Sequence, residues 1–310
     1  MKVLLLDMDS GTSKKQFPNL ALMKLSAYFK SKGDTVGFNE TDSPDIVYAS
    51  VVFSRNKHLV DGLKMYYPDS KIIVGGSGYD LTSSLNDEIE FIKPDYSLYN
   101  CDFSMGFTSR GCIRNCPFCI VNKKEGSIKN WQAIQGFHEE SHKHAMLLDN
   151  NFLASPNWKQ NIDYIREKGL SVDFNQGLDV RLITKDVARI LVDTKIRPYV
   201  RISFDSLHYE TQFRAGIQNL IDAGMKPRNI LVYVLVGFTD STFEADMKRV
   251  MIVWKQYGAE PYVMRYNHIS NNKLKKERIE YTYLAKWANR HYFTVCDFED
   301  YIPNKKRKKR

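Results

Sequence analysis

Continuous apolar runs and amphipathic segments alternate along the first 100 residues. The runs that predict buried strands are residues 2–9, 45–53 and 71–78. The segments with apolar positions at helical spacing are residues 17–33 and 56–67, the first closed by Gly33. Apolar strands that alternate with helices are typical of a parallel sheet. We therefore predict a small, doubly wound α/β domain over residues 1–100, which ends near Pro94.

The alternation continues over residues 101–270, with helix start signals between the strands. The six predicted strands are residues 103–109, 144–150, 171–176, 197–204, 229–237 and 261–267. Ser155, Thr184 and Ser241 are candidate N-caps, and Glu244 stands at capping-box spacing from Ser241. Six strand–helix units in a row predict a partial (β/α)6 barrel of the TIM type.

The last 40 residues, 271–310, form a charged extension. Residues 271–290 predict an amphipathic helix, and the aromatic segment that follows is expected to pack against the barrel. The net charge is +9, and Lys305–Arg310 supply six of these positive charges, so that +3 remains for the rest. We interpret this basic tail as a solvated end. Contact with the phosphates of a nucleic acid is the alternative.

Composition excludes several classes of protein. A hydrophobic fraction of 43% is that of a globular protein with a sizeable core, and no apolar stretch is long enough to span a membrane. The first apolar run is broken by Asp7 and Asp9, unlike a signal peptide. Five cysteines are too few, and odd in number, for a secreted disulfide framework. A reducing cytoplasm is the predicted compartment.

Three of the five cysteines lie within eight residues, in the segment RGCIRNCPFC, as Cys112, Cys116 and Cys119. A structural zinc site would need a fourth ligand. The candidates for it are Cys101, Cys296, His138, His142 and His144. A C-x-x-C redox pair would leave Cys112 without a role, and a core role does not fit the polar flanks. An iron–sulfur cluster held by three thiolates remains, with one iron open for another ligand.

The segment GFTSRGCIRNCPFCIVNKKEG (106–126) resembles the cluster loop of the radical S-adenosylmethionine (SAM) superfamily. The signature of that family is C-x3-C-x2-C, with an aromatic residue before the last cysteine, here Phe118, and a position after the first barrel strand. The resemblance implies that the three cysteines hold a [4Fe-4S] cluster whose fourth iron is chelated by SAM. Reductive cleavage of SAM would then give a 5′-deoxyadenosyl radical that abstracts hydrogen from a substrate.

The resemblance also implies partners and further site residues. An external electron donor such as flavodoxin or ferredoxin is expected, and RNA, peptides and small molecules remain open as substrates. By position, the SAM-binding candidates are Phe118, Asp149, Asn150, Asn151, Ser203, Asp205 and Gly237. The strand-end residues that face an active-site mouth in such barrels are the catalytic candidates Asn175, Gln176 and Arg181, with Asp179, Arg265, Tyr266 and His268 beside them. Strand-end turns explain residues 149–151 and Gly237 equally well.

The first domain resembles a shortened cobalamin-binding domain of the kind that precedes many radical SAM barrels. It lacks the Asp-x-His-x-x-Gly motif that supplies a cobalt ligand, so we favour a domain that kept the scaffold without the cofactor. Cobalamin is kept as the less favoured alternative. The alternative function for the whole chain is a zinc-binding, non-catalytic nucleic-acid-binding module.

Overall fold

The computed structural model of the chain describes residues 1–10, 17–39, 42–238, 241–266 and 275–301, with the side chains of 275–278 left out. The predicted basic tail and His268 lie outside these residues. The chain forms two compact units. The first comprises residues 1–112, 120–149 and 159–170, and the second comprises 113–119, 150–158 and 171–310. The predicted division at residues 100 and 270 stays a prediction.

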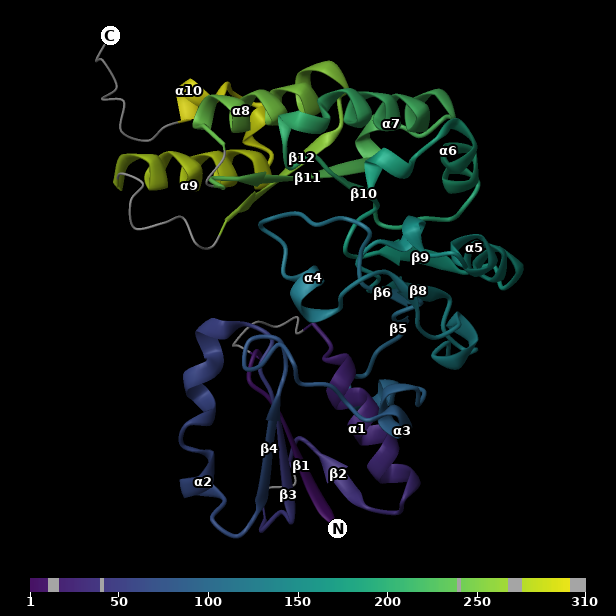
Figure 1. The fold of residues 1–310 in the computed structure, drawn as a ribbon, viewed down its shortest axis with the longest axis vertical. Helices are drawn as coiled ribbons and strands as arrows, with labels where there is room; N and C mark the ends of the chain where they lie inside the picture. The colour runs from purple at the N-terminus through teal and green to yellow at the C-terminus, as the bar shows by residue number, and fades with distance from the viewer. Residues whose placement is uncertain (11–16, 40–41, 239–240, 267–274, 302–310) are drawn as a thin grey trace. The chain divides into compact units, whose positions relative to one another are not determined.

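A four-stranded parallel sheet opens the first unit (Figure 1). Its order is β2-β1-β3-β4, with β1 at Lys2–Asp7, β2 at Thr35–Gly37, β3 at Ile46–Ser50 and β4 at Lys71–Gly75. Helix α1 (Leu20–Ser31) buries Leu22, Leu25 and Phe29 against Val3 and Leu5 of β1. The predicted parallel α/β class is confirmed for this region.

Both ends of α1 follow from the sequence. The side chain of Asn19 accepts a hydrogen bond from the backbone N–H of Leu22 at 3.2 Å, which satisfies one of the free donors of the first turn. Gly33, at φ +81°, adopts the left-handed conformation that commonly follows a helix. The predicted end of the helix is therefore confirmed.

The helix predicted over residues 56–67 is wrong as a single element. A 3₁₀ helix, η1 (Ser54–Val60), is followed by a one-turn helix, α2 (Leu63–Tyr66). η1 buries none of its residues and α2 buries Leu63 alone. A helix of this length depends on packing of an apolar face, and this segment has little to pack.

The rest of the first unit contains two further pairs of strands and several short helices. Strand β5 (Ser104–Gly106) pairs in parallel with β8 (His144–Leu147). Strand β6 (Ser109–Arg110) pairs with β7 (Lys129–Asn130) as an antiparallel ribbon. The short elements of this unit are α3 (Asp87–Glu90), η2 (Tyr96–Tyr99), α4 (Val121–Lys124) and η3 (Ile134–Gly136); α5 (Trp158–Glu167) completes it.

The second unit contains a parallel sheet of order β10-β11-β12. These strands are Val200–Ser203, Ile230–Val236 and Glu260–Arg265, and isolated parallel bridges join the region of β9 (Ser171–Phe174) to residues 196 and 202. The helices are α6 (Lys185–Val192), α7 (Glu210–Asp222), α8 (Phe243–Met251) and α9 (Lys275–Asn289). The predicted strand–helix alternation is confirmed, but the pairing among the described residues does not close a barrel.

Helix caps and the C-terminal aromatics test finer predictions in this unit. Thr184 accepts a hydrogen bond from Val187 N at 3.3 Å, as predicted. At α8 the cap is Thr242, not Ser241, because the hydroxyl of Ser241 instead donates to Asp246. The aromatic rings that follow α9 pack as expected. Phe293 and Phe298 are buried, and their ring centres lie 6.0 and 5.7 Å from that of Trp287.

Among the described helices, none combines the length and the apolar character needed to cross a bilayer.

Asp95 joins α1 to η2 and gives the first unit a pH-dependent contact. It accepts hydrogen bonds from Ser26 (2.6 Å), Lys30 (2.7 Å) and Ser97 (2.6 Å). Burial acts to raise the pKa of Asp95, but these hydrogen bonds outweigh it, so the pKa lies below its ordinary value. A lowered pKa contributes stability above the unfolded-state pKa of about 3.9, and this is lost as pH falls through the folded-state pKa.

Asp95→Asn is therefore expected to lower the free energy of unfolding at pH 7 by about 1–3 kcal/mol, the usual contribution of hydrogen bonds to a charged group. The difference from wild type should shrink below about pH 4 as the wild-type carboxylate is protonated. Chemical denaturation at pH 7 and pH 3 measures both values. Asp186→Asn, which alters an exposed ion pair, is the control. A difference that is the same at both pH values would contradict the role given to the carboxylate.

Candidate metal centre

The cysteine loop begins where β6 ends. Cys112 closes one segment of the first unit, and Cys116 and Cys119 belong to the second. All three are partly buried, and none of them forms a disulfide bond. Cys112 N donates to Gly126 O at 3.3 Å, and Cys119 N donates to Cys116 O at 3.0 Å, which makes a tight turn of the C-x-x-C segment. Within the described residues, no group of three His, Cys, Asp or Glu side chains forms a preassembled metal site.

The donor chemistry of the loop nevertheless fits an iron–sulfur cluster. Three thiols that form no disulfide are the ligands such clusters select. The loop backbone is also constrained, because Gly111 has φ +86° and an added Cβ would overlap the backbone carbonyl of Ser127. The turn that precedes Cys112 therefore requires glycine at position 111.

Three of the candidate fourth ligands, Cys101, His138 and His142, lie among other residues of the first unit. His138 contacts the Tyr164 hydroxyl at 2.9 Å, and His142 contacts the Ser104 hydroxyl at 3.1 Å. Burial lowers the pKa of His142. Burial also raises the pKa of Cys101 to about 11, which disfavours the thiolate that a metal requires. These environments give no support to a zinc site completed by Cys101, His138 or His142.

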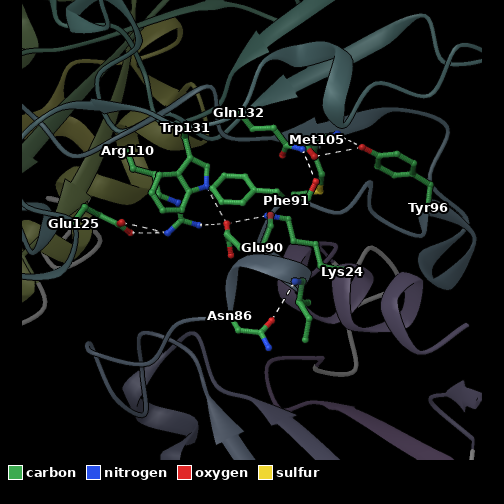
Figure 2. Close-up of polar contacts among 11 residues, drawn as sticks. Lys24, Asn86, Glu90, Phe91, Tyr96, Met105, Arg110, Glu125, Trp131 and Gln132 are labelled. Carbon is green, nitrogen blue, oxygen red and sulfur yellow. Dashed lines mark hydrogen bonds and ion pairs between the residues drawn. The ribbon is translucent and has the colours of Figure 1, made fainter. Parts of the chain in front are cut away.

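Arg110, two residues before Cys112, is held by a buried network in the first unit. Figure 2 shows Glu90 of α3 between Lys24, Arg110 and Trp131, whose nitrogens lie 2.9, 3.2 and 3.0 Å from one carboxylate oxygen. Arg110 also bonds both oxygens of Glu125, at 3.2 Å each. The network thus joins α1 and α3 to the start of the cysteine loop.

Aromatic rings complete the surroundings of Arg110. Its guanidinium carbon lies 4.2 Å from the ring centre of Phe107 and 4.8 Å from that of Trp131. Cation–π contacts of a desolvated guanidinium are worth about 2 kcal/mol, and together with two carboxylates they fix its position. Neither Glu90, Glu125 nor Trp131 was expected from the sequence, since no local motif links residues 90 and 110.

Asp149 binds the residues that lead into strand β6. It is buried and accepts hydrogen bonds from the backbone and hydroxyl groups of both Thr108 and Ser109, at 2.6–3.0 Å. Burial raises the pKa of Asp149, although these four hydrogen bonds oppose the rise. The carboxylate therefore anchors the residues that lead into the loop. Its predicted contact with the amino group of SAM stays a prediction.

In the second unit, Asp179 gathers several predicted site residues. It accepts hydrogen bonds from the Nε atoms of Arg114 (2.8 Å) and Arg181 (2.7 Å), and from the amide of Asn151 (3.4 Å). Burial acts to raise the pKa of Asp179, but the two arginines hold it below its ordinary value. Arg114 lies between Cys112 and Cys116, so Asp179 holds the middle of the cysteine loop.

Arg181 connects this cluster to the end of β10. Burial acts to lower the pKa of Arg181, but its hydrogen bond to Asp179 and the charge of that carboxylate raise it. Its guanidinium lies 4.6 Å from the ring centre of Tyr209, and the hydroxyl of Tyr209 accepts a hydrogen bond from Asp205 N at 2.6 Å. The structure thus brings Arg181 and Asp205 into one network near Cys116.

The remaining candidates have more ordinary surroundings. Asp205 accepts from Leu235 N at 3.0 Å, and burial raises its pKa. Gly237, at φ +76°, donates its N–H to Asp246 at 2.7 Å, so the turn itself explains the glycine. Asn175 and Gln176 contact each other at 3.3 Å in a turn after β9. Five of the candidates lie at or just after the ends of strands: Asn150, Asn175, Gln176, Ser203 and Gly237.

Phe118 belongs to a row of rings. Its ring centre lies 5.6 Å from that of Phe238 in an edge-to-face contact, and the ring centre of Phe238 lies 5.0 Å from that of Tyr266.

A buried ion pair in the second unit, between Arg249 and Asp246, was not predicted from the sequence. Arg249 donates to Asp246 and to the carbonyl oxygens of Phe204 (2.6 Å) and Leu235 (2.8 Å). A charged pair three residues apart on an otherwise apolar helix face was the available signal.

The glycines after β4 pack against the chain itself. An added Cβ at Gly76 would overlap Val51 O, and one at Gly78 would overlap the backbone of Phe53 and Ser54. A glycine turn after a strand can leave room for a cofactor beside the backbone, but at these two positions the chain's own backbone fills that room. This packing explains both glycines without cobalamin.

No protein-family description matches the chain, and no curated protein matches it either. Among solved structures, it is similar to an apo, selenomethionine-labelled cobalamin-dependent S-adenosylmethionine radical enzyme, OxsB, with a TM-score of 0.51 and 14% sequence identity. The match covers 97% of this chain and 55% of the other, so the chain spans about half the length of that protein. The chain thus has a mixed α/β fold like that of a radical SAM enzyme.

Proposed function

We propose that the chain is a radical SAM enzyme, in which Cys112, Cys116 and Cys119 hold a [4Fe-4S] cluster. The observation that carries the proposal is the loop itself. It places three thiols, none of them in a disulfide, at C-x3-C-x2-C spacing after the first strand of the second α/β region, in a chain whose fold is like that of a known radical SAM enzyme. When bound, such a cluster supplies the electron for reductive cleavage of SAM, delivered by a donor such as flavodoxin or ferredoxin.

The contribution of the protein is to hold the loop and the cofactor. Arg110 and Arg114 flank Cys112, and each is held by buried carboxylates: Glu90 and Glu125 for the first, Asp179 for the second. Preorganised ligands lose less conformational freedom when a metal binds. The residues proposed to contact SAM are Phe118, Asp149, Asn150, Asn151, Ser203, Asp205 and Gly237, with Asn175, Gln176 and Arg181 proposed to face the substrate.

The finer architecture and the second cofactor belong to the same proposal. We propose a partial (β/α)6 barrel, since six parallel strands follow one another with helices between them. OxsB is described as cobalamin-dependent, but the backbone packing at Gly76 and Gly78 favours a first domain without cobalamin here. The substrate class, RNA, peptide or small molecule, is left open by the site.

The test is the formation of 5′-deoxyadenosine. Anaerobically purified protein, reconstituted with iron and sulfide and given SAM and dithionite, is expected to release 5′-deoxyadenosine, measured by liquid chromatography and mass spectrometry. Protein without reconstitution is the control. Stoichiometric zinc in the anaerobically purified protein, together with no 5′-deoxyadenosine after reconstitution, would favour the zinc-binding alternative.

A further inference from the structure

An exposed aromatic and basic surface lies at the carboxyl ends of β3 and β4, in the first unit. We propose that this surface, made by Phe53, Arg55, Lys57 and Tyr79 and called here the platform, binds a single-stranded nucleic acid. None of these residues belongs to the cysteine loop, and the proposal does not depend on the proposed enzymatic function. It gives a role to the loop after β3 and to the glycine turn after β4.

The rings of the platform are exposed and paired with cations. Phe53 is 51% exposed and Tyr79 is 37% exposed. The guanidinium of Arg55 lies 4.7 Å from the ring centre of Phe53, and the Nζ atom of Lys57 lies 4.9 Å from that of Tyr79. Val52 and Leu59, 45% and 47% exposed, extend the apolar area beside them. Contiguous exposed apolar groups with a polar surround are typical of binding surfaces.

The backbone under the rings is fixed. Asp9 accepts hydrogen bonds from the N–H groups of Val52 and Phe53, the second at 3.2 Å, and from the side chain of Asn56 at 2.8 Å. The turn with Gly76 and Gly78 packs directly on the backbone of residues 51–54. The two rings are thus presented by a preorganised loop, which reduces the entropy lost when a ligand binds.

The charge of the platform suits a polyanion. Lys57 also donates to Tyr79 O at 3.2 Å, which ties the two loops together. Lys124 of α4, in the same unit, donates to Ser77 at 2.7 Å and brings a further cation to the glycine turn. The nearby carboxylate of Asp80 accepts hydrogen bonds from the hydroxyl of Thr82 at 2.8 Å and from its backbone N–H at 2.9 Å. Arg55, Lys57 and Lys124 thus bring three cations to this edge. Their positive charge complements the phosphates of a polyanion.

Single-stranded nucleic acids are bound by this combination of groups. Their bases stack on aromatic side chains, and their phosphates are neutralised by Lys and Arg. In a duplex the bases are paired and stacked on one another, so they could not stack on the side chains of Phe53 and Tyr79. The two ring–cation pairs lie on adjacent loops, so each loop offers one ring for stacking and one cation for a phosphate.

The experiment measures binding of the reconstituted full-length protein to a fluorescent 12-nucleotide uridine RNA by anisotropy. Phe53→Ala and Tyr79→Ala are each expected to weaken binding about tenfold, within the range for loss of one stacked base. The double variant Arg55→Ala/Lys57→Ala should weaken binding and reduce the slope of log K against log salt by about 1.4, as expected for two phosphates of a single strand.

The matched control is Lys226→Ala/Arg228→Ala in the second unit. It removes two exposed cations at the same spacing, also from a 3₁₀ turn, and should change affinity less than about twofold. An equal loss in the control and in Arg55→Ala/Lys57→Ala would overturn the platform, as would equal binding of duplex RNA or no binding by wild type. A matching thymidine DNA tests whether the sugar matters. Failure of the 5′-deoxyadenosine assay would leave these binding results unaffected.

Discussion

Replacing any one of Cys112, Cys116 or Cys119 with Ala is expected to reduce the iron content of the reconstituted protein to background. In the proposed site each thiolate supplies one of three protein ligands, and two ligands are not expected to hold a four-iron cluster. Cys101→Ala and Cys296→Ala are the matched controls and should retain iron, because neither belongs to the loop. Iron and sulfide assays with the visible absorption spectrum measure the result.

A second readout separates a cluster with an open iron from one with four protein ligands. Adding SAM to the reduced wild-type protein should change its electron paramagnetic resonance spectrum, since an iron that lacks a protein ligand gains nitrogen and oxygen ligands. If Cys101→Ala or Cys296→Ala strips the iron, the site has a fourth protein ligand. The proposed reaction would then lose the iron that SAM must reach.

The sequence predicted the elements that depend on local pattern. Helix α1 is closed by the left-handed Gly33, and continuous apolar runs mark β1, β3, β4 and β11. The cysteine spacing, too, is a local signal. Each of these features is read within about ten residues, where propensity and periodicity decide.

Contacts between distant residues could not be predicted in this way. Glu90 and Arg110 are 20 residues apart, and Arg114 and Asp179 are 65 apart. Asp179 was a substrate-contact candidate by its place at a strand end, whereas the structure engages it with Arg114 and Arg181. A pattern places a carboxylate at the end of a strand but does not say which cation will meet it there.

Two predictions failed. Residues 56–67 have helical spacing, yet η1 buries none of its side chains, so no packing stabilises a continuous helix. Ser241 and Thr242 are both acceptable caps, but the hydroxyl of Ser241 donates to Asp246, and Thr242 caps the helix. The first failure therefore came from the lack of tertiary packing, and the second from a local hydrogen bond that competes with the cap.

Glu90→Leu is expected to lower the free energy of unfolding by about 3–5 kcal/mol, the cost of removing one partner from a buried ion pair. The side chains of Lys24 and Glu90 are 3% and 8% exposed. Without Glu90, Lys24 keeps only the backbone carbonyl of residue 90, and Trp131 loses the acceptor of its indole N–H. Urea denaturation measures the loss. Glu139→Leu, which removes an exposed partner of Lys93, should cost less than about 1 kcal/mol.

The double variant Lys24→Met/Glu90→Leu separates the buried charge from the support of Arg110. Replacing a buried pair by apolar groups is often close to neutral, so the double variant should recover much of the stability lost in Glu90→Leu. Arg110 would keep Glu125 but lose one of its two carboxylates. Reduced iron content in a double variant of near-normal stability would therefore show that Glu90 positions the cysteine loop. Full iron content at the same stability would assign Glu90 to the fold of the first unit alone, and the position of Cys112 would then rest on Glu125, the flanking rings and the turn at Gly111.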